Sequence, residues 1–286
     1  MAKRSIGSMI LVAALLGVFA TVTPAAEQSQ PAAARRDALP RTPDDQPDIQ
    51  GVWLSVPIGS GAMRRRPERF SLEDIGLQGT GGTVRRGISR IVDPPDGNIP
   101  YQPLAAERQK KIFANHWNPK PEDLDPQARC FLQGVPRVMY SSDLQILQPP
   151  GHVVFLAGFG HSYRVVPLDG RPHLPEQVKL FMGDSRGRWE GNTLVVDITN
   201  NNDKTWLDVI GSFHSDALHV VERFTVVDAK TINYEATIED PQVYTRPWKL
   251  ALVLERLQEK DFELWEEACH EGERDVTHIL RSNGAE

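Results

Sequence analysis

The chain lacks the sequence signatures that most readily identify an enzyme. Its 286 residues contain no phosphate-binding P-loop and no dinucleotide-binding glycine fingerprint. GDSRG at 183–187 matches the Gly-x-Ser-x-Gly spacing, but no helical pattern follows it, so it is not a nucleophile elbow. The Gly-rich segment GTGGT at 79–83 lacks a strand before it and a helix after it, so we interpret it as a flexible loop. Covalent catalysis therefore has no support in the sequence, and we expect no cofactor.

Positive charge is also scarce. The chain has 32 Lys and Arg against 38 Asp and Glu, a formal net charge of −6. Its one basic cluster, RRRPER at 64–69, is typical of a solvated loop. A nucleic-acid-binding protein usually has a basic stripe along one face, so we do not expect a nucleic-acid partner.

Metal-binding spacing is missing as well. His214, His219 and His270 are the histidines most plausibly combined with carboxylates. However, His214 and His219 are five positions apart in HSDALH. Two histidines reach the same ion from a helix at a spacing of i, i+4, or from one face of a strand at a spacing of i, i+2, and this pair has neither spacing. We therefore predict no metal site.

Long apolar runs are limited to the start of the chain. Lys3 and Arg4 precede MILVAALLGVFATV, which is too short to span a membrane comfortably and is typical of a signal peptide. We predict a signal peptide over 1–26, a polar, disordered tether over 27–47, and a periplasmic or secreted location with no integral membrane segment after cleavage. The alternative is an uncleaved membrane anchor.

Cysteine is rare, and its rarity is informative. The chain has only Cys130 and Cys269. In an exported protein the oxidising compartment favours their pairing, and we predict one disulfide between them. Closing so long a loop would stabilise the fold by about 3–5 kcal/mol in the chain-entropy model.

What the chain has in abundance is strand pattern. From Asp143 onward, short apolar segments alternate with Gly, Pro, Asn and Asp, which is typical of an antiparallel meander. Gly191–Asn192 and Asp228–Lys230 have the composition of tight hairpin turns. The expected strands are 144–148, 152–159, 162–169, 193–199, 218–227, 231–239, 249–257 and 262–268.

The part before Asp143 is predicted to be rich in loops. Strands are expected at 48–56 and 88–92, and one helix is expected near 103–116, opened by Pro103 in its first turn. The residues from 48 to 286 are enough for one large β domain and do not require two.

So many hairpin-linked strands must protect their edges. We therefore predict a mostly all-β fold in which the meander forms a lipocalin-like barrel. A two-sheet sandwich is the alternative, because strand spacing alone does not distinguish the two.

The pleat of the predicted strands places several polar side chains inside. In LHVVERFTVV, Glu222 shares a face with apolar residues, whereas His219 lies on the other face. In the last expected strand, Glu266 and His270 point inward by the same alternation. A buried carboxylate requires a partner, and the candidates are Arg164, His270 and a ligand.

These residues define the predicted site. We predict that His214, Glu222 and His270 act as acid-base groups, because histidine titrates near neutral pH and burial raises a glutamate pKa toward it. The predicted ligand-binding residues are Arg164, Asp208, Tyr244, Trp248 and Glu266. The alternative is that the two glutamates form ion pairs near the barrel rim and have only a structural role.

Several sequence blocks resemble a known group of proteins. GDSRGRWEGNTLVVDIT, HSDALHVVERF, DPQVYTRPW and ACHEG, together with PDIQGVW and CFLQGVPR, resemble blocks shared by exported bacterial proteins, mostly of unassigned function. The resemblance implies secretion and a common β fold, and it implies no particular reaction.

The sequence therefore predicts a secreted β-barrel that binds a small organic molecule. Inward polar groups favour an acid-base enzyme of the lyase, isomerase or hydrolase type, since an apolar cargo would need mainly an apolar cavity. The alternative is a non-catalytic carrier or accessory protein of the same fold.

Overall fold

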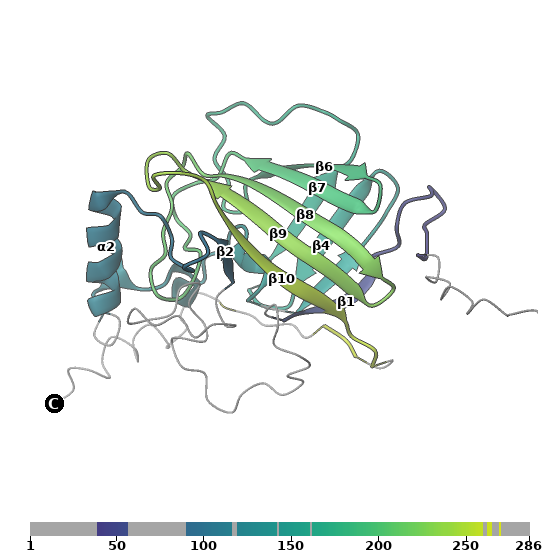
Figure 1. Ribbon diagram of the computed structural model, residues 1–286, viewed down its shortest axis with the longest axis horizontal. Helices are drawn as coiled ribbons and strands as arrows, with labels where there is room; N and C mark the ends of the chain where they lie inside the picture. The colour runs from purple at the N-terminus through teal and green to yellow at the C-terminus, as the bar shows by residue number, and fades with distance from the viewer. Residues whose placement is uncertain are drawn as a thin grey trace, which may run out of the picture. The chain divides into compact units, whose positions relative to one another are not determined.

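One antiparallel sheet accounts for most of the structure, a computed structural model (Figure 1). The structure describes residues 39–56, 90–115, 119–141, 143–160, 162–259, 262–264 and 269. No helix in these ranges is both long and apolar enough to cross a bilayer.

The strands follow the apolar segments of the sequence closely. In chain order they are β1 (Gly51–Val56), β2 (Ile91–Asp93), β3 (Leu144–Leu147), β4 (His152–Ala157), β5 (Tyr163–Pro167), β6 (Asp184–Glu190), β7 (Thr193–Thr199), β8 (His219–Asp228), β9 (Thr231–Glu239) and β10 (Trp248–Arg256). The α-helix α2 spans Pro103–Ala114, and short 3₁₀ turns occupy Pro121–Asp123, Pro126–Arg129 and Arg137–Met139.

Most strands pair with their neighbours in sequence. The order across the sheet is β5-β4-β3-β1-β10-β9-β8-β7-β6, with β2 paired to β10 beside this path. The β6–β7 hairpin turns at Gly191, whose φ of 60° suits glycine, and Glu190 pairs with Thr193 across it. Strands β1 and β2 depart from a sequential meander: β2 pairs with β10, and β1 lies between β10 and β3 and so joins the two groups of hairpins.

The two ends of the strand order, β5 and β6, meet through side chains. Within the described residues no ladder joins them, but a Cβ added at Gly187 would lie 2.6 Å from Val166 Cγ1 and 2.7 Å from Leu168 Cδ2. The missing side chain at Gly187 therefore lets β5 pack against β6. The result is a nearly closed antiparallel barrel, which confirms the predicted fold class.

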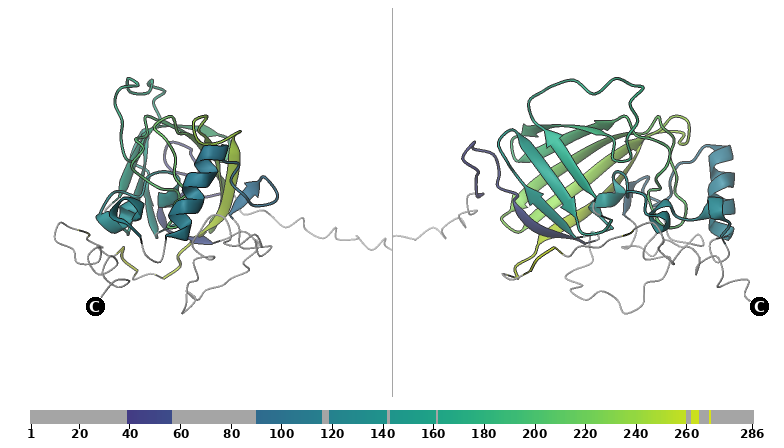
Figure 2. Two further views of the ribbon diagram at one scale, coloured as in Figure 1. Left: turned by 90° about the vertical axis from the view of Figure 1, so that its left-hand side faces the viewer. Right: turned by 180° about the vertical axis from the view of Figure 1, so that it is seen from behind.

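Figure 2 shows the two sides of this barrel. Seen from behind, the teal strands of the β3–β5 group lie in front of the green strands of the β6–β10 group. Along β8, burial alternates as predicted: Val220, Glu222 and Phe224 are buried, whereas His219 is only partly buried. The largest fully buried side chains include Trp53, Trp248, Tyr234, Tyr244, Phe155 and Phe224.

Helix α2 packs against the loop that precedes β8. A Cβ at Gly211 would lie 2.4 Å from Ile112 Cγ2, and Gln109 Nε2 donates a hydrogen bond to Ile210 O at 3.3 Å. The Arg108 guanidinium lies over the Phe213 ring, 4.2 Å from its centroid. These contacts explain why the predicted helix forms here, although only Ala105 and Ile112 of the helix are buried.

Two predicted elements differ from the structure. Strand β6 was not among the expected strands, because DSRGRWE is mostly polar. The strand expected at 262–268 is not found at Phe262–Leu264, and the rest of that segment lies outside the described residues. The predicted disulfide between Cys130 and Cys269 is confirmed, with their Cα atoms 5.2 Å apart.

Candidate functional site

A buried ion pair crosses the interior of the barrel. Arg164 on β5 is 3% exposed and Glu222 on β8 is 0% exposed, and Arg164 Nη2 donates to Glu222 Oε2 at 2.5 Å. Tyr234, on β9, donates its hydroxyl hydrogen to the other carboxylate oxygen, Glu222 Oε1, at 2.8 Å. Three strands therefore contribute one polar cluster, and Arg164 is among the partners that the sequence predicted for Glu222.

Aromatic rings surround this cluster. The Arg164 guanidinium lies 4.8 Å from the centroid of the Phe155 ring, which stacks on Phe224 at 5.1 Å. Phe224 in turn lies 5.0 Å from the ring of Tyr234. Each ring comes from an inward position of its strand, so the pleat that buries the core also places the polar cluster against flat apolar surfaces.

Arg164 has hydrogen-bonding capacity left over. Within the described part of the chain, its Nε and Nη1 atoms are buried and have no hydrogen-bond partner, and neither has Oγ of Ser162, which immediately precedes β5. Buried donors are nearly always paired in folded proteins. Among the described residues, the Arg164 side chain therefore keeps donors that are open to a further acceptor.

Tyr234 remains a hydrogen-bond donor over the whole physiological range. Burial raises its pKa well above 10, and the neighbouring Glu222 carboxylate raises it further, while Arg164 opposes the shift. A neutral phenol donates to a carboxylate, so Tyr234 supports Glu222 as the anion that pairs with Arg164.

His214 lies in the loop before β8 and is fully engaged with that loop. It is 3% exposed. Its Nδ1 atom is 2.9 Å from Ser215 O and its Nε2 atom is 2.7 Å from Thr205 Oγ1. Because a carbonyl only accepts, Nδ1 carries the hydrogen, and in the neutral ring Nε2 accepts from the threonine hydroxyl. Burial lowers the His214 pKa below its usual 6.5, outweighing the opposite effect of the Ser215 carbonyl.

Acidification is therefore expected to destabilise the protein through His214. Below about pH 6.5 the unfolded chain takes up a proton that the folded ring resists, so the free energy of unfolding falls with pH at up to about 1.4 kcal/mol per pH unit. Replacing His214 by Asn keeps a donor toward Ser215 O and should remove this slope.

Urea unfolding at a series of pH values between about 7.5 and 5 measures the effect. The matched control is His152→Asn, at the start of β4, which should retain the wild-type slope. Equal slopes for wild type and His214→Asn would contradict the assignment of a neutral, buried imidazole.

The other predicted residues have structural contacts of their own. Asp208 Oδ1 accepts hydrogen bonds from Ile210 N and Ser212 N at 3.1 and 2.9 Å, which shapes the loop before β8. Tyr244 donates its hydroxyl hydrogen to Phe213 O at 2.9 Å, and its ring packs edge-on against Trp248. Trp248 Nε1 is buried without a partner among the described residues.

The structure thus unites only part of the predicted site. Arg164 and Glu222 are in direct contact, but no hydrogen bond or ion pair within the described ranges joins His214 to either of them. Glu266 and His270 lie outside the described residues. Tyr234 was not named as a site residue, although its inward position on β9 follows from the alternation of TINYEATIE.

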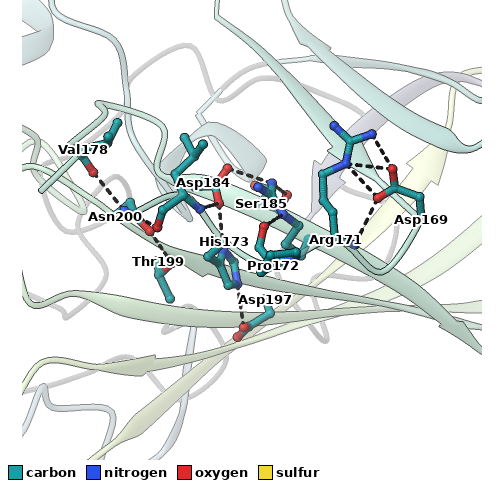
Figure 3. Close-up of polar contacts among 12 residues, drawn as sticks. Asp169, Arg171, Pro172, His173, Val178, Asp184, Ser185, Asp197, Thr199 and Asn200 are labelled. Atoms are coloured by element: carbon teal, nitrogen blue, oxygen red, sulfur yellow. Dashed lines mark hydrogen bonds and ion pairs between the residues drawn. The ribbon is translucent and has the colours of Figure 1, made fainter. Parts of the chain in front are cut away.

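A second polar network lies on the outside of β6, β7 and β8, and Figure 3 shows its centre. His173, in the loop between β5 and β6, contacts Asp184 Oδ2 through Nδ1 and Asp197 Oδ2 through Nε2, both at 2.9 Å. On the other side of Asp197, His219 Nε2 lies 2.6 Å from Oδ1. Burial raises the Asp197 pKa, but hydrogen bonds from His219 and His173 outweigh it and lower the pKa overall.

This network anchors the long loop that connects the two ends of the strand order. Asp184 also accepts from Leu174 N at 3.0 Å and from Arg186 Nη1 at 2.7 Å. Nothing in the described part of the chain groups three or more His, Cys, Asp or Glu side chains for a metal ion. The sequence carried no clear signal for this network, because its members come from one loop and three strands.

Comparison with known proteins adds little to this picture. The chain matches no family model and no curated protein. Among solved structures it is similar to a mutant of the fluorescent protein UnaG, at 16% identity and a TM-score of 0.24, over 41% of this chain and 72% of that one. A likeness of this size carries no argument about ligand or activity.

Proposed function

We propose that the protein binds a small organic molecule inside its barrel and that Arg164 anchors it. The observation that carries this proposal is the pair of unpartnered donors, Nε and Nη1, on a side chain that is 3% exposed. Leaving charged donors buried and unpaired is costly, so a chain that retains them gains from an occupant that accepts their hydrogen bonds.

The contacts favour binding without catalysis over acid-base chemistry. Both oxygens of Glu222 already accept hydrogen bonds within the cluster, one from Arg164 and one from Tyr234, so neither oxygen is free to contact a substrate. Both ring nitrogens of His214 are likewise occupied. A carrier or accessory protein therefore fits the described groups better than a lyase, isomerase or hydrolase.

We also propose that the protein works outside the cytoplasm. The basic start, the apolar run and the small residues near Ala25 support export, as does the resemblance of its sequence blocks to exported bacterial proteins. The disulfide between Cys130 and Cys269 is compatible with an oxidising compartment.

Titration with the neutral naphthalene ketone Prodan tests the binding proposal, because the emission of this dye shifts to the blue in an apolar site. Wild-type protein should give a saturable shift. Arg164→Lys keeps a positive charge beside Glu222 but removes the planar fork of donors, and it should weaken binding about tenfold or more, as expected for the loss of a hydrogen bond from a charged group.

The matched control is Arg223→Lys on the outer face of β8, where the side chain is 41% exposed. This variant should bind the dye like the wild type, and thermal unfolding should show that all three proteins are folded at the temperature of the titration. A dye that fails to saturate, or that binds Arg164→Lys as tightly as wild type, would contradict the proposal.

A further inference from the structure

The charge balance around Arg164 restricts the ligand that the site can accept. Arg164 carries one positive charge and Glu222 one negative charge, and their closest atoms are 2.5 Å apart. Tyr234 adds no charge, because burial beside Glu222 keeps its phenol protonated. The buried cluster is therefore neutral before any ligand enters.

A ligand anion would upset this balance. It would compete with Glu222 for the single guanidinium and leave one carboxylate in the barrel interior without a countercharge, and isolated buried charges are strongly unfavourable. A neutral acceptor avoids this cost, because it takes hydrogen bonds from Arg164 without adding charge.

We infer that the natural ligand of the barrel presents a neutral hydrogen-bond acceptor, such as a ketone or amide oxygen, to Arg164, and that its body is flat and apolar. This inference rests on the proposed function and specifies the class of ligand. The guanidinium offers only donors, so its partner must be an acceptor.

The surroundings define the rest of the ligand. Phe155 faces the guanidinium, and Phe155, Phe224 and Tyr234 form a continuous series of ring contacts at 5.1 and 5.0 Å. Aromatic surfaces of this kind favour offset or edge contacts with a planar, conjugated molecule. Ser162, which immediately precedes β5, has a buried hydroxyl with no partner among the described residues, and this hydroxyl is a further group that accepts from or donates to the ligand.

A series of three competitors with the same ring system tests the inference by displacement of bound Prodan. Acetylnaphthalene has a neutral acceptor, naphthoate has an anionic one, and ethylnaphthalene has none. For wild-type protein we expect acetylnaphthalene to displace the dye at least tenfold more effectively than either of the others.

The same series applied to Glu222→Gln tests the physical reason. Without the Glu222 charge, Arg164 is the only ion in the cluster, so naphthoate should gain at least tenfold in apparent affinity relative to acetylnaphthalene. The matched control, Glu190→Gln, removes a carboxylate that is 40% exposed and pairs with Arg188 and Arg223 at the surface. It should retain the wild-type ranking.

The outcomes separate this inference from the proposed function. If Prodan binds and depends on Arg164, but naphthoate displaces it best from the wild type, the protein is a binding protein for anions and the inference is wrong. If acetylnaphthalene and ethylnaphthalene compete equally, the free donors hold water only, and the inference is again overturned. If Glu222→Gln does not fold, the order in which the three competitors displace Prodan from the wild-type protein is sufficient to test the inference.

Discussion

Replacing Arg164 by methionine should lower the free energy of unfolding by about 3–5 kcal/mol, the usual cost of removing one partner of a buried ion pair. The cost arises mainly at Glu222, which is 0% exposed and would lose its countercharge and keep only the Tyr234 hydroxyl as a partner. Methionine is flexible enough to fill much of the vacated space beside Phe155 without strain. Urea unfolding monitored by tryptophan fluorescence measures the change.

The double variant Arg164→Met with Glu222→Met gives the physical reason its own test. With both charges removed, most of the lost stability should return, because an apolar pair of similar volume is often as stable as a buried ion pair. Arg223→Met, on the outside of β8, serves as control and should change the free energy by less than about 1 kcal/mol. A double variant as unstable as Arg164→Met would show that packing, not an unpaired Glu222 charge, dominates the effect.

Removing the disulfide is the second change with a large expected effect. Cys130 and Cys269 are separated by 139 positions, and opening a loop of this length should cost about 4–5 kcal/mol in the chain-entropy model. The expected result for Cys130→Ser with Cys269→Ser is a stability lower by up to this amount, with the barrel still formed, because the bridge joins a segment before β3 to a segment after β10 and neither cysteine belongs to the buried core.

Unfolding with and without a reductant measures this contribution in the wild type. The double serine variant is the control, since a reductant should not change its midpoint. Intact-mass analysis after alkylation under non-reducing conditions checks the bond itself: two alkylated thiols in protein from an oxidising compartment would contradict it.

The strand pattern was predictable because it depends on local alternation. Leu144–Leu147, His152–Ala157 and Thr231–Glu239 combine apolar inward positions with turn residues at both ends, and each formed the expected strand. Strand β6 was missed because Asp184, Arg186, Arg188 and Glu190 alternate with Ser185, Gly187 and Trp189, so it lacks the apolar face by which its neighbours are recognised. Strand β6 is stabilised by pairing with β7, and the residues of β6 alone do not indicate this pairing.

The candidate site shows the same division. The alternation along β8 was enough to place Glu222 inside, and the cost of burying a carboxylate was enough to require a partner. Which partner it has was decided by the curvature of the sheet, which brings Arg164 from β5 across the interior to β8. The contacts of His214 could not be predicted from the sequence, because the loop before β8 is shaped by side-chain hydrogen bonds at Asp208 and Thr205.

The sequence by itself determined the class of fold, the one disulfide and the inward direction of the Glu222 side chain. These features follow from rules that act within a few residues or from there being only one way to pair two cysteines. The tertiary structure alone decided that β1 lies between β10 and β3, that β5 and β6 meet at Gly187, and that Nε and Nη1 of Arg164 find no partner among the described residues. Each of these depends on contacts between segments far apart in the chain, and local alternation places no constraint on such contacts.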